Sequence, residues 1–507
     1  MRTRFAGGIA LLTVIAAGCG GLAASPTDPA DGPLPSDPTM MDFADPSRVD
    51  GLTTRTLASH LTSTNGRRVH ITYPSIPSTP ALTDRLRDEV TRQLREFTDS
   101  TSTESTGGHA PEFNVEWRLA AVSPDVIGVR LRSGTLAGRP WTNATRTLWY
   151  HQPSRRALDS TGLLKDSAAL AVLAGKVRQR LAPRAPAVNM TSITPVPSMF
   201  DSIAFNRDGD LVVEFDDGQV AHPSLGRVAV AVPREEADPL LSAVGRRARQ
   251  AAVEAPRQMI TPPPVQAFDD RPPKARSVTA GSVDCAEAKC VALTFDDGPG
   301  PHTDRLLSIL AEHGARATFF TLGSNAAAQP GTLRRMRDGG HLVANHSWSH
   351  RDLGALSGSL LSDQLARTQS AVDAALGQVP TLMRPPYGSA GTEVAKVAEQ
   401  MGLSVVEWSV DTRDLADRDP EAIARRAVAG AEPGAVIRLH DVYRETVDAL
   451  PAVLTGLRER GFVLVTVPEL DGLHAMEPGR TYYAGRAATS TAPSPHASGR
   501  PQGASSP

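Results

Sequence analysis

The sequence predicts an α/β protein with two folded domains: a smaller α+β domain over residues 51–253 and a barrel-like α/β domain over residues 284–473. A chain of 507 residues is too long for one ordinary hydrophobic core. In the second domain, polar side chains follow directly after β-prone runs, and functional groups gather at the C-terminal ends of strands in barrel-like α/β folds. These two observations together predict two domains, with the functional groups in the second.

The overall composition excludes two classes of function. Hydrophobic residues make up 40% of the chain, and its formal net charge is −2. Because the charge is nearly balanced, the chain as a whole is not expected to bind nucleic acid or an anionic lipid surface. After the N-terminus, no apolar run is long enough to cross a bilayer.

The N-terminus has the pattern of an export signal. A basic tetrapeptide and a short apolar stretch are followed by Ala16-Ala17-Gly18-Cys19, which predicts a signal peptide over residues 1–18. Small residues ending in cysteine resemble the lipobox of bacterial lipoproteins. This resemblance implies that Cys19 is lipidated and anchors the protein on the outer side of the cell membrane. An ordinary signal peptide with an incidental Cys19 is the alternative. Residues 19–50, rich in Pro, Ser, Asp and Gly, then predict a flexible tether.

The chain holds only three cysteines. With Cys19 assigned to the anchor, Cys285 and Cys290 remain as a pair in an oxidising setting, which favours a disulfide that closes a small loop at the start of the second domain. A metal site is the alternative, but no further Cys or nearby His completes a tetrahedral ligand set.

Two further segments are dense in Pro and Gly. Residues 254–283 predict a semi-rigid linker between the domains. Residues 474–507 predict a disordered tail, because they have little apolar surface to bury.

The first domain mixes strand and helix patterns. Strands are expected at 69–73, 126–131 and 147–150, helices at 82–97 and 167–181, and a closing hairpin over 202–215. This order, with the phrases Arg156-Ala-Leu-Asp159 and Leu163-Leu-Lys165, resembles the extracellular domain of the RsiV-type anti-sigma factors. The resemblance implies a protein ligand, which is lysozyme in that family.

No catalytic cluster is expected in this first half. Its histidines are scattered without the spacing of metal ligands: His60, His70, His109, His151 and His222.

A first chemical motif lies where an expected strand, residues 291–295, meets Asp296-Asp297-Gly298-Pro299. Two adjacent carboxylates at the end of a buried strand repel each other unless a cation lies beside them.

Further along, His346-Ser-Trp-Ser-His350 places two imidazoles at positions i and i+4, which predicts one face of a helical turn. Two His and one carboxylate are a common ligand set for a catalytic divalent metal. One Asp is then expected to bind the metal and the other to stay free as a base. Taken alone, each motif also fits a surface turn or a chance pair on a helix.

Three further motifs follow in the same domain. Arg384-Pro-Pro-Tyr-Gly388 comes after an expected helix over 364–376. Asp411-Thr-Arg-Asp414 comes after an expected strand over 405–410, and His440 ends an expected strand over 435–440.

In their order, these five motifs resemble those of the polysaccharide deacetylases of the NodB-homology family. The resemblance covers almost the whole second domain and implies a distorted (β/α) barrel with fewer strands than the full eight. It also implies hydrolysis of N-acetyl or O-acetyl groups on chitin, peptidoglycan, xylan or a related polysaccharide.

The resemblance implies a role for each site residue. Asp297, His346 and His350 hold a divalent metal, usually zinc, and Asp296 is the general base that takes a proton from the metal-bound water. His440 is the general acid that protonates the leaving amine.

Three more residues are expected to support this centre. Arg384 pairs with Asp296 and keeps it anionic, and Asp414 orients His440 and raises its pKa. The backbone N–H of Tyr387 stabilises the oxyanion.

The expected acetyl pocket departs from the family pattern. Pro386 contributes to it, but Leu415 stands where the family commonly has Trp, and Arg438 stands where it commonly has Leu. Since an unpaired buried cation is costly, either Arg438 turns outward and pairs with an acid, or the pocket is altered.

The expected function is metal-dependent N-deacetylation of peptidoglycan N-acetylglucosamine or N-acetylmuramic acid outside the membrane, because a lipid anchor suits an immobile wall polymer. One alternative is O-deacetylation of a xylan-type polysaccharide or deacetylation of chitin oligosaccharides. An alternative of another class is a surface sensor or binding lipoprotein with a weakened deacetylase domain.

Overall fold

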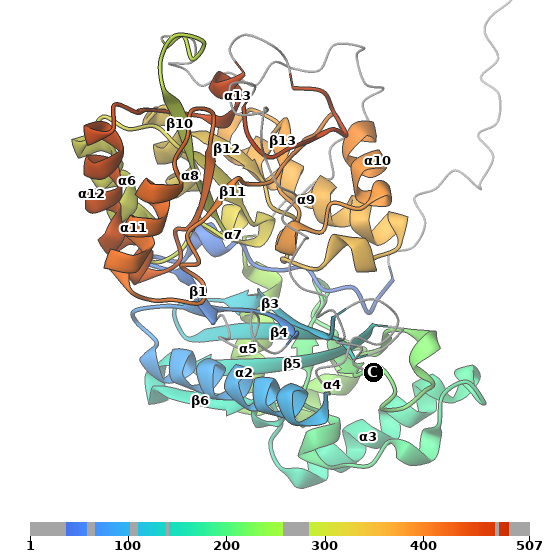
Figure 1. Ribbon diagram of the computed structural model, residues 1–507. Coiled ribbons are helices and arrows are strands. Elements are labelled where there is room, and N and C mark those ends of the chain that lie inside the picture. Colours follow the sequence, from blue (N-terminus) through green and yellow to red (C-terminus); the bar gives the residue numbers. More distant parts are fainter. Residues whose placement is uncertain are drawn as a thin grey trace, which may run out of the picture. The chain divides into compact units, whose positions relative to one another are not determined.

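The computed structural model describes residues 37–57, 66–101, 110–137, 141–256, 283–471 and 476–485 (Figure 1). From residue 38 onward these belong to one compact unit. The expected signal peptide, Cys19 and most of the expected linker over 254–283 lie outside the described residues. Within the described ranges, no helix is long and apolar enough to cross a membrane.

The N-terminal half is built on a six-stranded sheet of order β1-β2-β3-β4-β5-β6. Its strands are β1 (Thr53–Leu57), β2 (Arg68–Ser75), β3 (Glu112–Val122), β4 (Val126–Leu136), β5 (Thr142–His151) and β6 (Arg156–Asp159). In this sheet only β2 and β3 pair in parallel, because helix α2 (Pro80–Ser100) connects them as a crossover. Helix α2 buries Leu82, Leu86 and Val90, spaced one turn apart, in the same core as Ile71 of β2.

A three-stranded sheet completes this half. It consists of β7 (Ile203–Phe205), β8 (Leu211–Phe215) and β9 (Val228–Val232), with helices α3 (Ser167–Leu181), α4 (Arg234–Ala237) and α5 (Ala243–Glu254). Trp149 of β5 is fully buried and donates from Nε1 to the Ile203 carbonyl at 3.1 Å. This hydrogen bond ties the two sheets together.

The C-terminal half is a curled parallel sheet of nine strands in the order β15-β16-β10-β11-β12-β13-β14-β18, with β17 also beside β10. The strands are β10 (Cys290–Asp296), β11 (Thr318–Thr321), β12 (Leu342–Asn345), β13 (Leu382–Met383), β14 (Ser404–Val406), β15 (Val410–Asp411), β16 (Val436–His440), β17 (Val463–Val465) and β18 (Thr481–Tyr482). The helices are α6 (Thr303–Glu312), α7 (Gly323–Ala328), α8 (Pro330–Asp338), α9 (Gly358–Leu376), α10 (Thr392–Gln400), α11 (Pro420–Gly430), α12 (Arg444–Glu459) and α13 (Val467–Leu470) (Figure 1). The expected α/β fold with an incomplete barrel is confirmed.

The alternation of side chains along β10 determines where the site lies. Val291, Leu293 and Phe295 pack into the core shared with the helices. Successive side chains of a strand point to opposite faces, so Thr294 and Asp296 point away from that core.

Most expected elements form, with shifts at their ends. The helices expected at 82–97, 167–181 and 364–376 lie within α2, α3 and α9, and the closing hairpin is β7–β8.

Two local expectations are wrong. His346 and His350 do not lie on a helical turn, because Ser347 and His350 adopt φ values of 67° and 61° and the segment is a loop. The expected strand over 405–410 is two short strands, of which β14 pairs with β13 and β15 pairs with β16.

Two expected boundaries also differ. In the expected tether, Ala44 N–H donates to the Leu119 carbonyl and Asp45 N–H to the Pro256 carbonyl, both at 2.8 Å, so residues 38–50 include structured chain. In the expected tail, β18 pairs with β14, so the prediction of disorder is wrong for 476–485.

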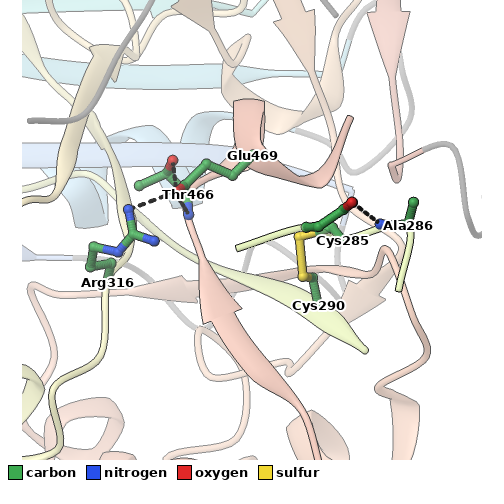
Figure 2. The surroundings of a disulfide bond; sticks show 7 residues. Cys285, Ala286, Cys290, Arg316, Thr466 and Glu469 are labelled. Atoms are coloured by element: carbon green, nitrogen blue, oxygen red, sulfur yellow. Dashed lines mark hydrogen bonds and ion pairs between the residues drawn. A yellow bond between two sulfur atoms is a disulfide. The ribbon is translucent and has the colours of Figure 1, made fainter. Parts of the chain in front are cut away.

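A disulfide joins Cys285 to Cys290 across the loop that leads into β10 (Figure 2). Because the two sulfurs are bonded to each other, neither is free as a metal ligand, and both cysteines are buried. In the same surroundings, Arg316 forms an ion pair of 2.7 Å with Glu469, and Glu469 closes a capping box with Thr466 at the start of α13.

Candidate metal centre and active site

The two adjacent aspartates at the end of β10 have different partners. Asp296 forms an ion pair with Arg384, whose Nη1 lies 2.7 Å from Asp296 Oδ1. Arg384 is fully buried and also donates to Thr294 Oγ1 and to the carbonyls of Val406 and Glu407, at 2.8 to 3.0 Å. Because these bonds hold the guanidinium in one position, the charge of Asp296 is compensated and its carboxylate is held as well.

Asp297 turns instead toward two imidazoles. Its Oδ1 lies 3.4 Å from His346 Nε2 and 3.3 Å from His350 Nε2. All three side chains are buried, and in the described structure neither Asp297 Oδ1 nor His350 Nδ1 has a hydrogen-bond partner. Two ligands of a tetrahedral zinc ion, each about 2.1 Å from the metal, lie about 3.4 Å apart. The separations therefore fit a shared metal ion better than direct hydrogen bonds.

The protonation states of these residues also suit a metal. His346 Nδ1 lies 2.7 Å from the Arg384 carbonyl oxygen, so Nδ1–H donates there and the ring is oriented with Nε2 toward Asp297. Burial lowers the pKa of His350 well below its usual value, which keeps that ring neutral. Burial by itself raises the pKa of Asp297, but the surrounding imidazoles outweigh it and hold the pKa well below its usual value. Neutral imidazoles and an ionised carboxylate are the forms that bind metals.

Backbone strain is concentrated in the same segments. Of the described non-glycine residues with left-handed φ, only Arg155 lies outside the five motifs, and the others are Asp297 (73°), Ser347 (67°), His350 (61°), Tyr387 (62°) and Arg413 (56°). L-residues adopt this region rarely, and such strain persists where the surrounding structure requires one particular shape.

A histidine at the end of the neighbouring strand pairs with an aspartate from the turn after β15 (Val410–Asp411). His440 ends β16 and is in register with Asp296 of β10. Its Nδ1 lies 2.8 Å from Asp414 Oδ1, and Thr446 Oγ1 donates to Asp414 Oδ2 at 2.8 Å. Burial by itself lowers the pKa of His440, but the charge of Asp414 and its hydrogen bond outweigh burial and raise the pKa to about 9. At pH 7 this imidazole therefore carries the proton that a general acid needs.

Known proteins share this second half of the chain. The profile of the family described as polysaccharide deacetylase matches residues 284–406. The chitooligosaccharide deacetylase of Rhizobium leguminosarum bv. trifolii is 36% identical over 194 residues, which cover 35% of this chain and 90% of that protein. The chain belongs to the polysaccharide deacetylase family.

Two similar family members act on peptidoglycan by name. The peptidoglycan-N-acetylglucosamine deacetylase of Listeria monocytogenes is 40% identical over 196 residues, covering 38% of this chain and 41% of that protein. The peptidoglycan-N-acetylmuramic acid deacetylase of Bacillus subtilis is 41% identical over 184 residues, covering 36% of this chain and 39% of that protein. The chain thus spans well under half of the length of these two relatives. The expected resemblance of the second half, called the deacetylase domain below, is confirmed, whereas the RsiV-type resemblance of the first half stays a prediction.

Arg438 pairs with an acid, and it lies on the same face of β16 as His440, because Ile437 and Leu439 face the core shared with the helices. Its Nη2 lies 2.9 Å from Asp411 Oδ2, and its guanidinium lies 3.6 Å above the ring of Trp408. The cation is therefore paired and stacked. Of the other expected pocket residues, Pro386 is buried and Leu415 is half-buried.

Two further rings lie against His350. Tyr387 meets it edge-on, with ring centroids 4.6 Å apart. His70 of β2 stacks on it, with centroids 4.3 Å apart and planes inclined by 19°. One ligand atom each of His70, Asp297 and His350 lie within 4.8 Å of one another. His70 is therefore part of the site, although its sequence spacing did not reveal it.

The sequence holds one weak signal for His70. Val69 and Ile71 face the core of the N-terminal half, so strand alternation puts His70 on the opposite face, which is often solvated in sheets of this kind. Strand β2 is instead buried on both faces from Val69 to Pro74. A polar residue in such a strand needs a partner, but sequence alone does not say which.

The other histidines of the N-terminal half do not reach the site. His151 and His222 hydrogen-bond to Ser154 and Ser224. His60 and His109 lie outside the described residues.

Separate substitutions of Asp296 and Asp297 test which of the two carboxylates binds the metal. If Asp297 is the expected ligand, Asp297→Asn weakens zinc binding by more than the roughly 10–100-fold typical of an outer-shell partner, because it removes the negative charge between the two imidazoles. Asp296→Asn is expected to leave zinc affinity nearly unchanged, since Arg384 holds that side chain. Competition with a chromophoric chelator measures both affinities, and an equal loss in the two variants contradicts the assignment.

The Asp414–His440 pair predicts a pH effect. Since His440 has a pKa of about 9, kcat/KM for acetate release is expected to fall as pH rises through about 9. Asp414→Asn removes the charge that raises this pKa, so the alkaline limb should move to lower pH. Thr446→Val, which removes only a hydrogen bond to Asp414, should move it less. A limb that stays in place in Asp414→Asn contradicts the role of His440 as the acid.

Proposed function

We propose that the protein removes acetyl groups from the amide nitrogen of peptidoglycan amino sugars, N-acetylglucosamine or N-acetylmuramic acid, with a zinc ion held by Asp297, His346 and His350. The observation that carries the proposal is the register of Asp296 with His440 on neighbouring strands. A proton acceptor and a proton donor then stand beside one another next to the metal ligands, as hydrolysis of an amide requires.

Each residue of the site has a separate role in the proposed hydrolysis. When bound, the metal ion polarises the acetamide carbonyl and lowers the pKa of water. Asp296, held in place by its ion pair with Arg384, accepts the proton of the attacking water. The backbone N–H of Tyr387 donates to the oxyanion. An amine leaves poorly unless it is protonated, and His440, with Nδ1 held by Asp414, presents Nε2–H to it.

The substrate class rests on the relatives and on the N-terminus. The two relatives from Listeria and Bacillus are named for peptidoglycan, and the Rhizobium relative is named for chitooligosaccharides. The expected lipid anchor at Cys19 favours a wall polymer, because an anchored enzyme reaches an immobile polymer that lies against the membrane. The protein is therefore proposed to act outside the cytoplasm. For the N-terminal half, the RsiV-type resemblance supports a protein ligand of the lysozyme kind.

Two other functions remain as outcomes of the test. O-deacetylation of a xylan-type polysaccharide uses the same residues, because esters and amides pass through similar tetrahedral states. A sensor or binding lipoprotein with a weakened deacetylase domain is supported by the presence of His70 in the site.

The direct test is acetate release from purified peptidoglycan by the zinc-loaded full chain, with mass spectrometry of the digest to identify the sugar. Release is expected, and Asp296→Asn should reduce it by at least about 100-fold, as expected for loss of a general base. Asp373→Asn, at an exposed acid of α9, is the matched control and should keep full activity. Release from acetylated xylan but not from peptidoglycan supports the ester function. No release from peptidoglycan, chitin oligosaccharides or xylan contradicts the proposal.

A further inference from the structure

A histidine from outside the deacetylase domain occupies the metal centre. His70 belongs to β2 of the N-terminal sheet, and its side chain is only 3% exposed. It stacks on His350, and its ligand atom lies within 4.8 Å of those of Asp297 and His350. Its Nε2 is buried and has no hydrogen-bond partner in the described structure.

This arrangement is unfavourable without a cation. Burying an imidazole nitrogen that makes no hydrogen bond costs its interaction with water. Asp297 Oδ1 is also buried and without a hydrogen-bond partner in the described structure. A metal ion between these groups supplies the missing partner for a lone pair of His70 and for the carboxylate.

His70 is held in place by regular structure. Strand β2 pairs with β1 on one side and with β3 on the other, where His70 is in register with Asn114. A side chain on a central strand of a sheet is positioned more exactly than one on a loop. The pairing of the strands in the sheet therefore fixes the position of His70 next to the metal ligands.

Contacts on both sides of His70 clamp the sheet to the loop that carries His350. Arg68 forms an ion pair with Asp352. Asn114 Nδ2 donates to the Ser349 carbonyl at 2.5 Å, and Glu112 Oε1 accepts from Asp352 N–H at 3.1 Å. These contacts flank the metal ligand His350 on either side in the sequence.

We propose that His70 is a fourth protein ligand of the metal centre, supplied by the N-terminal sheet, and that it closes the centre until the sheet moves away. The inference rests on the proposed function, because it concerns the same metal. Zinc sites with four protein ligands are closed structural sites, whereas catalytic sites keep a position open for water or substrate. While His70 is bound, the acetyl group cannot take its position. At any moment, therefore, only those molecules in which the sheet has moved away can release acetate, and the N-terminal half lowers the activity of the full chain.

Metal binding tests this directly, without relying on activity. His70→Ala in the full chain is expected to weaken zinc binding at least about tenfold, as measured by chelator competition. It should also change the visible spectrum of the Co²⁺-substituted protein, because a water replaces an imidazole. His151→Ala, at a histidine of β5 in the same sheet that bonds to Ser154, is the matched control and should change neither.

A second variant distinguishes the loss of a metal ligand from misfolding of the protein. His70→Cys offers a thiolate in place of the imidazole, and thiolates are strong zinc ligands. Tight zinc binding is expected to be retained, and a thiolate-to-Co²⁺ charge-transfer band should appear in the near ultraviolet. Absence of that band, or zinc affinity in His70→Ala equal to that of the unaltered protein, overturns the proposal.

The closing role of His70 is tested by removing contacts between the N-terminal sheet and the loop that carries His350, in what we call the clamp variant. Arg68→Ala combined with Asn114→Ala leaves every metal ligand in place but loosens the contacts with the loop that carries His350. Acetate release from an acetylated chitin oligosaccharide is expected to rise severalfold in this variant and in His70→Ala. Unchanged or lower release in the clamp variant overturns the closing role. If no variant releases acetate while the metal readouts change as expected, the proposed function fails and the fourth ligand stands.

Discussion

The structure depends on a buried carboxylate, Asp297, on which imidazoles converge without hydrogen-bonding to it. Its Oδ1 lies 3.3 and 3.4 Å from two imidazole nitrogens and has no other partner in the described residues. A charge taken out of water must be paired or must coordinate a metal. The neighbouring Asp296 meets the same requirement differently, through Arg384. The two adjacent acids thus differ in their surroundings, because one is neutralised by a guanidinium and the other faces imidazoles, which suits the two roles proposed for them.

The parallel sheet brings these groups together from distant parts of the chain. His346 follows β12, Arg384 follows β13 and His440 ends β16, so each is delivered to the same end of the sheet as Asp296. Functional groups collect at that end because the strands run in one direction. The left-handed backbone of the neighbouring residues Asp297, Ser347 and Tyr387 shows that the loops at this end of the sheet are shaped for the site at a cost in local conformational energy.

Sequence reasoning found the deacetylase domain because its ligands are carried in short contiguous motifs at strand ends. It failed where geometry is set by tertiary contacts. The spacing of His346 and His350 fits a helical turn, but the left-handed φ of Ser347 makes a loop. The run over 405–410 is β-prone throughout, yet it divides between two places in the sheet. His70 could not be predicted, because its partners lie in another domain and share no local pattern with it.

In the proposed centre, the cation is held by Asp297 and its imidazoles and not by Asp296. A crystal structure of the zinc-loaded full chain, with anomalous diffraction recorded on both sides of the zinc edge, tests it most directly. One strong peak is expected about 2.0–2.2 Å from Asp297 Oδ1, His346 Nε2 and His350 Nε2, the usual ligand distances of zinc. The Asp296–Arg384 ion pair is expected to stay intact. A peak bound to Asp296, or no peak between these imidazoles, would contradict it.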